Sequence, residues 1–311
     1  MNQTMYFESI PCPLCGSERR SVVYSGTFPK EITQEFLSEV YRSSSDRGLF
    51  EQVVQCDQCT LVYLNPRLKS ELIIGGYAGG EDRAFIEQDA MRIRTFTTAL
   101  RRLKREYRLS FSRSMKVLDI GCAGGAFLRA AEKLGLSATG IEPSKWLSQY
   151  AREEHGLDVH SGTLSNNQFP DSSFDIVTLW DVIEHLSNPE SELHQIYRIL
   201  KPAGLLIVNY PDFGSLPAKL LGRKWPFLLS VHLIYYTRQT MRQQLKKAGF
   251  EILDSGLHWQ TLELRYVLKR AAAYFPTIRY LGRLIESIGV GSLPLTYWIG
   301  QTRVIARRYE R

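Results

Sequence analysis

The 311-residue sequence lacks the features of a membrane, fibrous or disordered protein. It contains no apolar run of about 18 residues, so we expect no transmembrane helix. Its first residues, MNQTMYFESI, form neither a basic region nor a long apolar run, so no secretory signal is predicted. Low-complexity tracts and internal repeats are also absent. With 44% hydrophobic residues, the composition predicts a soluble globular protein, which we expect in the cytoplasm.

Cysteine is scarce, and its positions are informative. Four of the five cysteines form two pairs with identical spacing, Cys12-Pro-Leu-Cys15 and Cys56-Asp-Gln-Cys59. Two residues between thiolates place both sulfurs on one turn, and two such turns supply the four ligands of a closed tetrahedral zinc site. Because protein would fill all four positions, we expect a structural zinc. Disulfides are the weaker interpretation, since Cys122 is left over and no secretory signal is predicted.

Basic residues exceed acidic ones, with a formal net charge of +7 and a basic cluster at residues 92–113. Apolar residues are interleaved in this cluster at helical spacing, among them Phe96, Leu100 and Leu103. The pattern favours the solvated face of a helix that packs on the rest of the protein. We therefore do not expect a nucleic-acid partner.

The segment VLDIGCAGGAF, at residues 117–127, predicts a strand, a glycine-rich turn and a helix. The strand ends near Asp119. Gly121 and Gly125 in the turn let the backbone pass close to a ligand. The N-terminus of the next helix presents unpaired N–H groups to that ligand. Such turns serve NAD, FAD and phosphate sites, and some are only tight turns. The turn alone therefore predicts a nucleotide-like pocket without identifying the nucleotide.

Two further predicted strands lead to acidic residues that would line the same pocket. Residues 137–141 predict a buried strand before Glu142, about 20 residues after Asp119, where an acidic residue normally hydrogen-bonds a ribose diol. A carboxylate only accepts hydrogen bonds, so it suits two hydroxyl donors and would repel a 2′-phosphate. Residues 174–180 form an apolar run, typical of a parallel strand covered on both faces, that leads into Asp181. The pattern predicts an α/β sheet that binds an unphosphorylated ribonucleoside.

These segments closely resemble the class I methyltransferases that use S-adenosylmethionine. The resemblance rests on four motifs in the usual order, VLDIGCAGG, TGIEPS, FDIVTLWDVIEHL and LKPAGLLIVNYPD. It implies a Rossmann-like α/β sheet with helices on both faces, with Asp119 and the turn after it at the methionine end of the cofactor. It also implies that Glu142 binds the ribose and that the region after Gly162 flanks the adenine. The predicted cofactor-binding residues are Asp119, Gly121, Cys122, Ala123, Gly125, Glu142, Pro143, Gly162, Thr163, Trp180 and Asp181.

Some residues of this predicted site have simpler interpretations. Asp119 could only cap a helix, and Glu142 could be a neighbour of an N-cap. Within the turn, we expect Cys122 to be a small packing residue rather than a nucleophile. Ala123 departs from the family, which more often has glycine there. Its methyl group should be tolerated if the φ angle of the residue is negative, although it narrows the space around the cofactor.

The amino-terminal part resembles bacterial methyltransferases that carry a zinc ribbon before the catalytic domain. After the second cysteine pair the chain continues LVYLNPRLKSELIIGGY, and in that group a tyrosine near this position can border the substrate pocket, which makes Tyr77 a candidate. The later segment VHLIYYT makes His232 the first candidate for a substrate-facing base. His185 is the second candidate, with Asp181 and Tyr236 as orienting groups. The alternatives are packing for Tyr77, a backbone carbonyl partner for His232 and a loop cap for His185.

The absence of one family motif narrows the range of possible methyl acceptors. The strand that ends at Trp180 lacks the Asn/Asp-Pro-Pro-aromatic turn of the family's amino-group methylases, which disfavours amine acceptors. We expect O- or C-methylation of a small molecule, such as a sugar, a nucleotide-linked sugar, a quinone or another secondary metabolite. One alternative is an RNA methyltransferase that holds RNA with the zinc ribbon and the basic helix. Another is an inactive zinc-ribbon scaffold.

The expected organisation is a zinc ribbon at residues 1–66, a linker and helical region at 67–112 and a cofactor-binding domain at 113–311. Helical patterning also occurs inside the ribbon, between residues 27 and 49. A long amphipathic region at 262–288 precedes a last strand at 296–306, and a homodimer could form through it.

Overall fold

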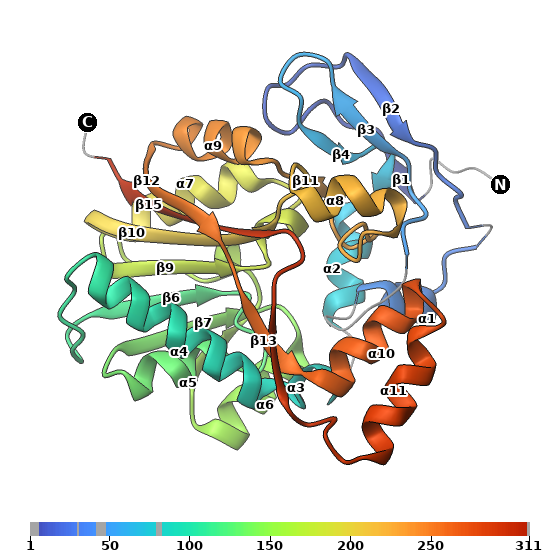
Figure 1. Cartoon of the computed structure of the whole chain (residues 1–311). Coiled ribbons are helices and arrows are strands. Elements are labelled where there is room, and N and C mark those ends of the chain that lie inside the picture. The colour runs from blue at the N-terminus through green and yellow to red at the C-terminus, as the bar shows by residue number, and fades with distance from the viewer. Residues whose placement is uncertain (1–5, 30, 42–47, 79–82, 310–311) are drawn as a thin grey trace.

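The computed structural model describes residues 6–29, 31–41, 48–78 and 83–309. Its main sheet has seven strands in the order β12-β15-β10-β9-β6-β7-β8 (Figure 1). The strands from β6 to β10 run parallel, and β15 runs antiparallel to both β10 and β12. Their bounds are β6 Lys116–Ile120, β7 Ser137–Glu142, β8 Asp158–Ser161, β9 Phe174–Trp180, β10 Leu200–Pro211, β12 Phe250–Leu257 and β15 Gln301–Arg308. The predicted Rossmann-like α/β sheet is confirmed.

Helices cover both faces of this sheet because successive strand residues point to opposite sides. In β9, Val177 and Leu179 enter one hydrophobic core, and Ile176 enters the other. The first core also holds side chains of α7 and α9, and the second holds those of α4, α5 and α6 (Figure 1). These helices are α4 Asp89–Glu106, α5 Ala126–Lys133, α6 Lys145–His155, α7 Pro189–Ile199 and α9 Arg238–Lys247.

The basic segment 92–113 forms most of α4, and its pattern is that of a packed helix, as expected. Leu100 and Leu103 are buried, whereas Arg101 and Arg102 are exposed. The basic residues therefore occupy the solvent face of a helix whose apolar face packs on the body of the protein.

A second, four-stranded sheet contains the amino-terminal ribbon, in the order β11-β4-β3-β2. Its strands are β2 Arg20–Tyr24, β3 Val53–Cys56, β4 Val62–Leu64 and β11 Ile234–Tyr235. The last of these comes from residues 113–311, the expected cofactor-binding domain, which is called the catalytic part below. It pairs antiparallel with β4, so that Ile234 lies opposite Tyr63. The backbone N–H of Leu64 also donates to the carbonyl of Leu233 at 2.9 Å. The ribbon and the catalytic part thus share a sheet.

The two parts share a hydrophobic core as well. Buried ribbon residues such as Val54 and Leu61 belong to the same apolar cluster as Val177 of the central sheet. The expected division of the chain into separate units at residues 66 and 112 remains a prediction. Among the remaining ribbon elements, helix α1 (Gln34–Tyr41) lies where helical patterning is expected, and β1 (Phe7–Glu8) pairs with β5 (Arg67–Leu68).

Additional elements surround the carboxyl ends of the central strands. The amphipathic region 262–288 forms two helices, and the expected last strand at 296–306 is interrupted at Gly300, so that β14 and β15 belong to different sheets. Within the described residues, no helix is both long and apolar enough to cross a membrane. The elements are α2 Ser70–Ala78, α3 Arg83–Ile86, η2 Leu164–Asn166, η3 Ile183–His185, α8 Leu216–Leu221, η4 Gly222–Lys224, β13 Gln260–Glu263, α10 Leu264–Tyr274, α11 Ile278–Ser287 and β14 Pro294–Tyr297.

The shared core predicts that a ribbon mutation destabilises the catalytic part. Leu64 is fully buried, so we expect Leu64→Ala to lower the free energy of unfolding by about 2–5 kcal/mol. All five tryptophans lie after residue 145, so tryptophan fluorescence during urea unfolding reports the catalytic part. The control Val22→Ala, at a ribbon position that is 57% exposed, should change this free energy by no more than about 0.5 kcal/mol. An unshifted tryptophan transition in Leu64→Ala would show that the ribbon is energetically independent.

Candidate active site

A cavity of about 890 Å³ lies beside the carboxyl ends of β6, β7 and β9. In parallel α/β sheets this edge is the usual ligand-binding position, because the strand ends and the helix N-termini meet there. Residues from the turn after β6, from the loops after β7 and β9, and from the segments around β11 and β13 line the cavity. It is therefore bordered both by the predicted cofactor motifs and by later segments of the chain.

Asp119, in β6, borders the cavity from beneath the glycine-rich turn. Its carboxyl is buried and accepts a hydrogen bond from Thr178 Oγ1 at 2.6 Å. Burial raises the pKa of Asp119 to about 8, although the Thr178 hydroxyl lowers it. The next turn begins with Gly121 at φ +71°, where a Cβ atom would lie 2.6 Å from Val182 Cγ2. The positive φ and the close contact both require glycine at this position.

Glu142, at the end of β7, is held by two backbone amides. The N–H of Ala123 donates to Oε2 at 2.8 Å, and the N–H of Ser144 donates to Oε1 at 2.7 Å. Burial raises the pKa of Glu142 to about 7, while these two donors lower it. These backbone donors therefore orient the carboxyl group at the cavity wall.

Ala123 adopts φ +48°, so the condition of a negative φ is not met. A residue with a Cβ atom is strained in the left-handed region by about 1–2 kcal/mol, which explains the family's preference for glycine. The Ala123 amide donates to Glu142 from this conformation. The turn thus keeps the left-handed backbone despite the methyl group.

Most of the predicted cofactor residues line the cavity. Ala123, Gly125 and Gly162 are exceptions that shape its backbone frame instead. A Cβ atom on Gly125, at φ +84°, would lie 2.2 Å from Leu157 Cδ1. Cys122 lines the cavity but is buried, and burial raises the pKa of its thiol well above the usual value. This supports a packing role for Cys122. The lining residues of the predicted set are Asp119, Gly121, Cys122, Glu142, Pro143, Thr163, Trp180 and Asp181.

The two candidate histidines meet at one end of the cavity. The ring centroids of His185 and His232 are 4.8 Å apart, and both rings line the cavity. Nδ1 of His185 donates to the carbonyl of Val231 at 2.8 Å, and Nδ1 of His232 donates to the carbonyl of Phe227 at 2.7 Å. The carbonyl partner considered for His232 therefore exists, yet it fixes only one of the two ring nitrogens.

Both imidazoles are neutral in this environment. Burial lowers the pKa of His185 to about 4, although the Val231 and Asp181 carbonyls raise it. Burial also lowers the pKa of His232 well below its usual value, and the neighbouring His185 ring lowers it further. With Nδ1–H donating, each Nε2 carries the lone pair of the neutral ring.

The other predicted groups have different positions. Asp181, at φ +54°, accepts hydrogen bonds from Asn209, Gln260 and Gln301, so it belongs to an amide network in the cavity wall. Burial raises its pKa to about 6. Tyr236 is not among the lining residues, because its ring is 1% exposed and packs against Tyr210 in the core. The expected orienting role of Tyr236 therefore lacks a direct contact with the cavity.

Tyr77 lies in α2, but its side chain is outside the described residues, as are Gly79 and Gly80. Several lining residues were missed by sequence reasoning: Phe85, Arg92, Phe227, His258, Tyr266, Arg270 and Tyr297. They lie outside the four motifs that carry the family resemblance.

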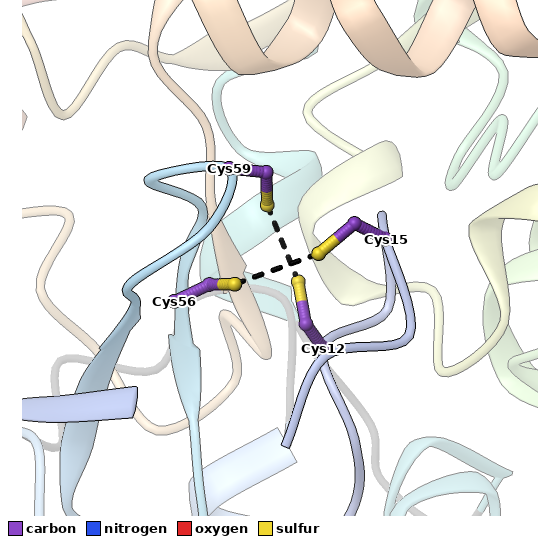
Figure 2. A group of neighbouring side chains, drawn as sticks. All are labelled: Cys12, Cys15, Cys56 and Cys59. Carbon is purple, nitrogen blue, oxygen red and sulfur yellow. Dashed lines mark hydrogen bonds between the residues drawn. The ribbon is translucent and has the colours of Figure 1, made fainter. Parts of the chain in front are cut away.

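The side chains of the four paired cysteines point toward one another, as Figure 2 shows. Sγ of Cys12 is 3.4 Å from Sγ of Cys59, and Sγ of Cys15 is 3.5 Å from Sγ of Cys56. All four sulfurs lie within 4.8 Å of one another. A tetrahedral ion with zinc–sulfur bonds of about 2.3 Å would hold sulfurs about 3.8 Å apart, so this four-cysteine cluster fits a zinc ion. These separations are far too long for disulfide bonds, and the cysteines are free thiols.

Residues 91–255, more than half of the chain, match a family described as a methyltransferase domain. The chain belongs to this methyltransferase family. Its cofactor is accordingly S-adenosylmethionine, and the enzyme is a class I methyltransferase in which the four-cysteine cluster is consistent with a zinc ribbon. Membership supports an active enzyme over an inactive scaffold.

Curated relatives of the methyltransferase include ubiquinone biosynthesis O-methyltransferases. The mitochondrial protein of Schizosaccharomyces pombe is 30% identical over 128 residues, which cover 38% of this chain and 44% of that protein. The Nitrosococcus oceani protein is 26% identical over 167 residues, which cover 49% of this chain and 71% of that protein. The chain thus spans less than half the length of the first relative. The similarity to these relatives is distant.

Among solved structures, the methyltransferase resembles a chain in the complex between the Haloferax volcanii Trm112 methyltransferase activator and a methyltransferase. The TM-score is 0.53 at 19% identity, covering 75% of this chain and 100% of that chain. At this identity the likeness concerns the fold alone.

The four-cysteine cluster predicts a bound zinc ion that stabilises the shared core. We expect Cys56→Ser to lower the zinc content by one equivalent per chain, measured by mass spectrometry of the metal, and to lower the unfolding midpoint of the tryptophan signal. Cys122→Ser is the control, since the fifth cysteine lies in the other core and should leave the zinc content unchanged. Equal zinc content in wild type and Cys56→Ser would refute a zinc site at the cluster.

Proposed function

We propose that the methyltransferase transfers the methyl group of S-adenosylmethionine to an oxygen, or an acidic carbon, of a small molecule bound in the cavity. The observation that carries this proposal is the continuity of one cavity from Asp119 and Glu142 to His185 and His232. A cofactor at the first pair would have an acceptor beside it at the second. The sulfonium carries its own leaving group, so catalysis rests on holding the nucleophile in line with the methyl carbon.

For the cofactor, we propose that Glu142 accepts hydrogen bonds from the two ribose hydroxyls. Its carboxyl already accepts from two backbone amides, which orient it. Thr163, with Asn166 of η2 beside it, lines the cavity at the proposed adenine position. Asp119 and the turn after it take the methionine end. These roles are supported by the family and by the lining positions.

Beyond the proposed cofactor residues, aromatic and cationic side chains line the cavity. They include Phe227, Tyr266 and Tyr297, together with Arg92 and Arg270. Aromatic walls favour a flat ring, and guanidinium groups favour an oxygen-rich or anionic substituent. We therefore favour a quinone-like or other oxygenated aromatic acceptor over a sugar or nucleotide-linked sugar. Incubation of the enzyme with quinone-precursor, sugar and RNA pools, followed by mass spectrometry for an added methyl group, tests this assignment.

An RNA acceptor receives less support. The exposed arginines of α4, such as Arg101 and Arg102, point to solvent, while the same helix offers Arg92 to the cavity. The ribbon sheet is paired with β11 and packed on the catalytic core. Methylation confined to the RNA pool would overturn the small-molecule assignment.

The proposed ribose contact predicts weaker cofactor binding without Glu142. Loss of hydrogen bonds to a charged acceptor costs about 1.5–3 kcal/mol, so Glu142→Ala should raise the Kd for S-adenosylmethionine by about 10- to 100-fold in calorimetry. The control is Glu153→Ala on the exposed face of α6. Because protonation removes the acceptor, wild-type affinity should fall as the pH is lowered through the Glu142 pKa of about 7. Affinity that is unchanged in Glu142→Ala would remove this residue from the cofactor site.

The position of the imidazoles predicts that they act on the acceptor and not on the cofactor. We propose that His232 is the first group to act on the acceptor hydroxyl, with His185 beside it as the second. His232→Ala should lower kcat about 10²- to 10⁴-fold and leave the Kd for S-adenosylmethionine unchanged. His194→Ala, at an exposed position of α7, should match wild type in both. Weaker cofactor binding with unchanged kcat would instead indicate a structural role.

A further inference from the structure

Three potential metal ligands lie together at the acceptor end of the cavity. Glu184 and His185 belong to η3, directly after β9, and His232 lies just before β11. One ligand atom from each side chain lies within 4.8 Å of the other two. All three residues line the cavity. This group is separate from the four-cysteine cluster in sequence and in ligand type.

The buried carboxyl group of Glu184 is the main indication of a cation at this position. The residue is 1% exposed, and neither carboxylate oxygen has a hydrogen-bond partner among the residues that the structure describes. A buried carboxylate without a partner is costly, and proteins normally pair such a group or place it on a metal. A divalent ion between Glu184 and the imidazoles would satisfy it.

The two imidazoles are held as metal-binding histidines usually are. In each, Nδ1–H donates to a backbone carbonyl, that of Val231 for His185 and that of Phe227 for His232. Such an outer hydrogen bond fixes the ring orientation and leaves the lone pair on Nε2. The segment that carries His232 is itself fixed, because the N–H of Leu233 donates to the carbonyl of Glu184 at 2.9 Å.

We propose that Glu184, His185 and His232 bind one divalent metal ion at the acceptor end of the cavity. Two imidazoles and one carboxylate are a donor set for Zn²⁺, Fe²⁺ or Mn²⁺, and three protein ligands leave coordination positions open. This arrangement contrasts with the four-cysteine cluster, whose thiolates would close the coordination sphere of zinc.

The role of this ion rests on the proposed methyl transfer. An open position facing the cavity suits a hydroxyl oxygen of the acceptor, whose proton is lost to solvent because the ion stabilises the anion. That oxygen then forms a bond to the methyl carbon, the carbon–sulfur bond breaks, and its electron pair stays on sulfur in S-adenosylhomocysteine. Two open positions favour an acceptor with two neighbouring oxygens, such as a catechol or a vicinal diol.

Manganese provides a probe that avoids the thiolate site, since Mn²⁺ prefers oxygen and nitrogen ligands. The full chain is dialysed against a chelator until only the ribbon zinc remains, and Mn²⁺ is titrated while the signal of the free ion is followed by electron paramagnetic resonance. We expect one bound Mn²⁺ per chain. Glu184→Gln and His232→Gln should each raise the Kd for Mn²⁺ roughly tenfold or more. Glu192→Gln is the matched control, because this carboxyl lines the same cavity outside the proposed ligand set.

Circular dichroism and the Kd for S-adenosylmethionine check that each variant is folded, and His185→Gln provides a third ligand variant. Absence of Mn²⁺ binding to folded wild type, or equal binding by the Glu184 and Glu192 variants, would overturn the metal site. Metal binding that depends on Glu184 supports it even if no acceptor is methylated, in which case only the proposed function falls. Full turnover by an enzyme that holds only the ribbon zinc would leave the proposed function standing and remove the metal.

Discussion

The pairing of β4 with β11 is the contact on which the acceptor end of this methyltransferase depends. It joins Tyr63 to Ile234 across the ribbon and the catalytic part, and the neighbouring Leu64 N–H holds the carbonyl of Leu233. The N–H of Leu233 in turn holds the carbonyl of Glu184. His232 directly precedes Leu233 in the chain and directly follows Val231, whose carbonyl accepts the hydrogen bond from His185. The ribbon sheet therefore helps to position both imidazoles.

The cofactor end depends on a different constraint, which is local backbone strain. Ala123 and Asp181 adopt φ +48° and +54°, a region that costs a residue with a side chain about 1–3 kcal/mol. The Ala123 amide contacts Glu142, and the Asp181 amide donates to the carbonyl of Asn209 at 3.1 Å. Strain at these turns is offset by the packed strands on either side, which hold the carboxyl groups at the cavity wall.

The sequence predicted the central strands and the turn after β6 because short-range patterns determine them. Glu142 is the last residue of β7 and Asp181 comes directly after β9, so their positions at the cavity could be predicted. His258, Tyr266 and Arg270 could not, since they reach the cavity through the β13–α10 segment, whose path depends on tertiary packing. The same limit explains Tyr236, which comes directly after the two-residue strand β11. No local sequence pattern indicates that its ring packs in the core. Nor could the shared sheet be predicted, because β11 is only two residues long.

The two ends of the cavity are held in place by different parts of the chain. The cofactor end is built on β6 and β7, whose pairing lies wholly within the central sheet. The acceptor end is built on η3 and the segment before β11, which the ribbon holds in place. A closed thiolate site suits this task, because an ion with no open position can stabilise the ribbon without competing for the acceptor. The ribbon therefore contributes to methyl transfer by fixing one wall of the cavity. A change in the ribbon should affect acceptor binding more than cofactor binding.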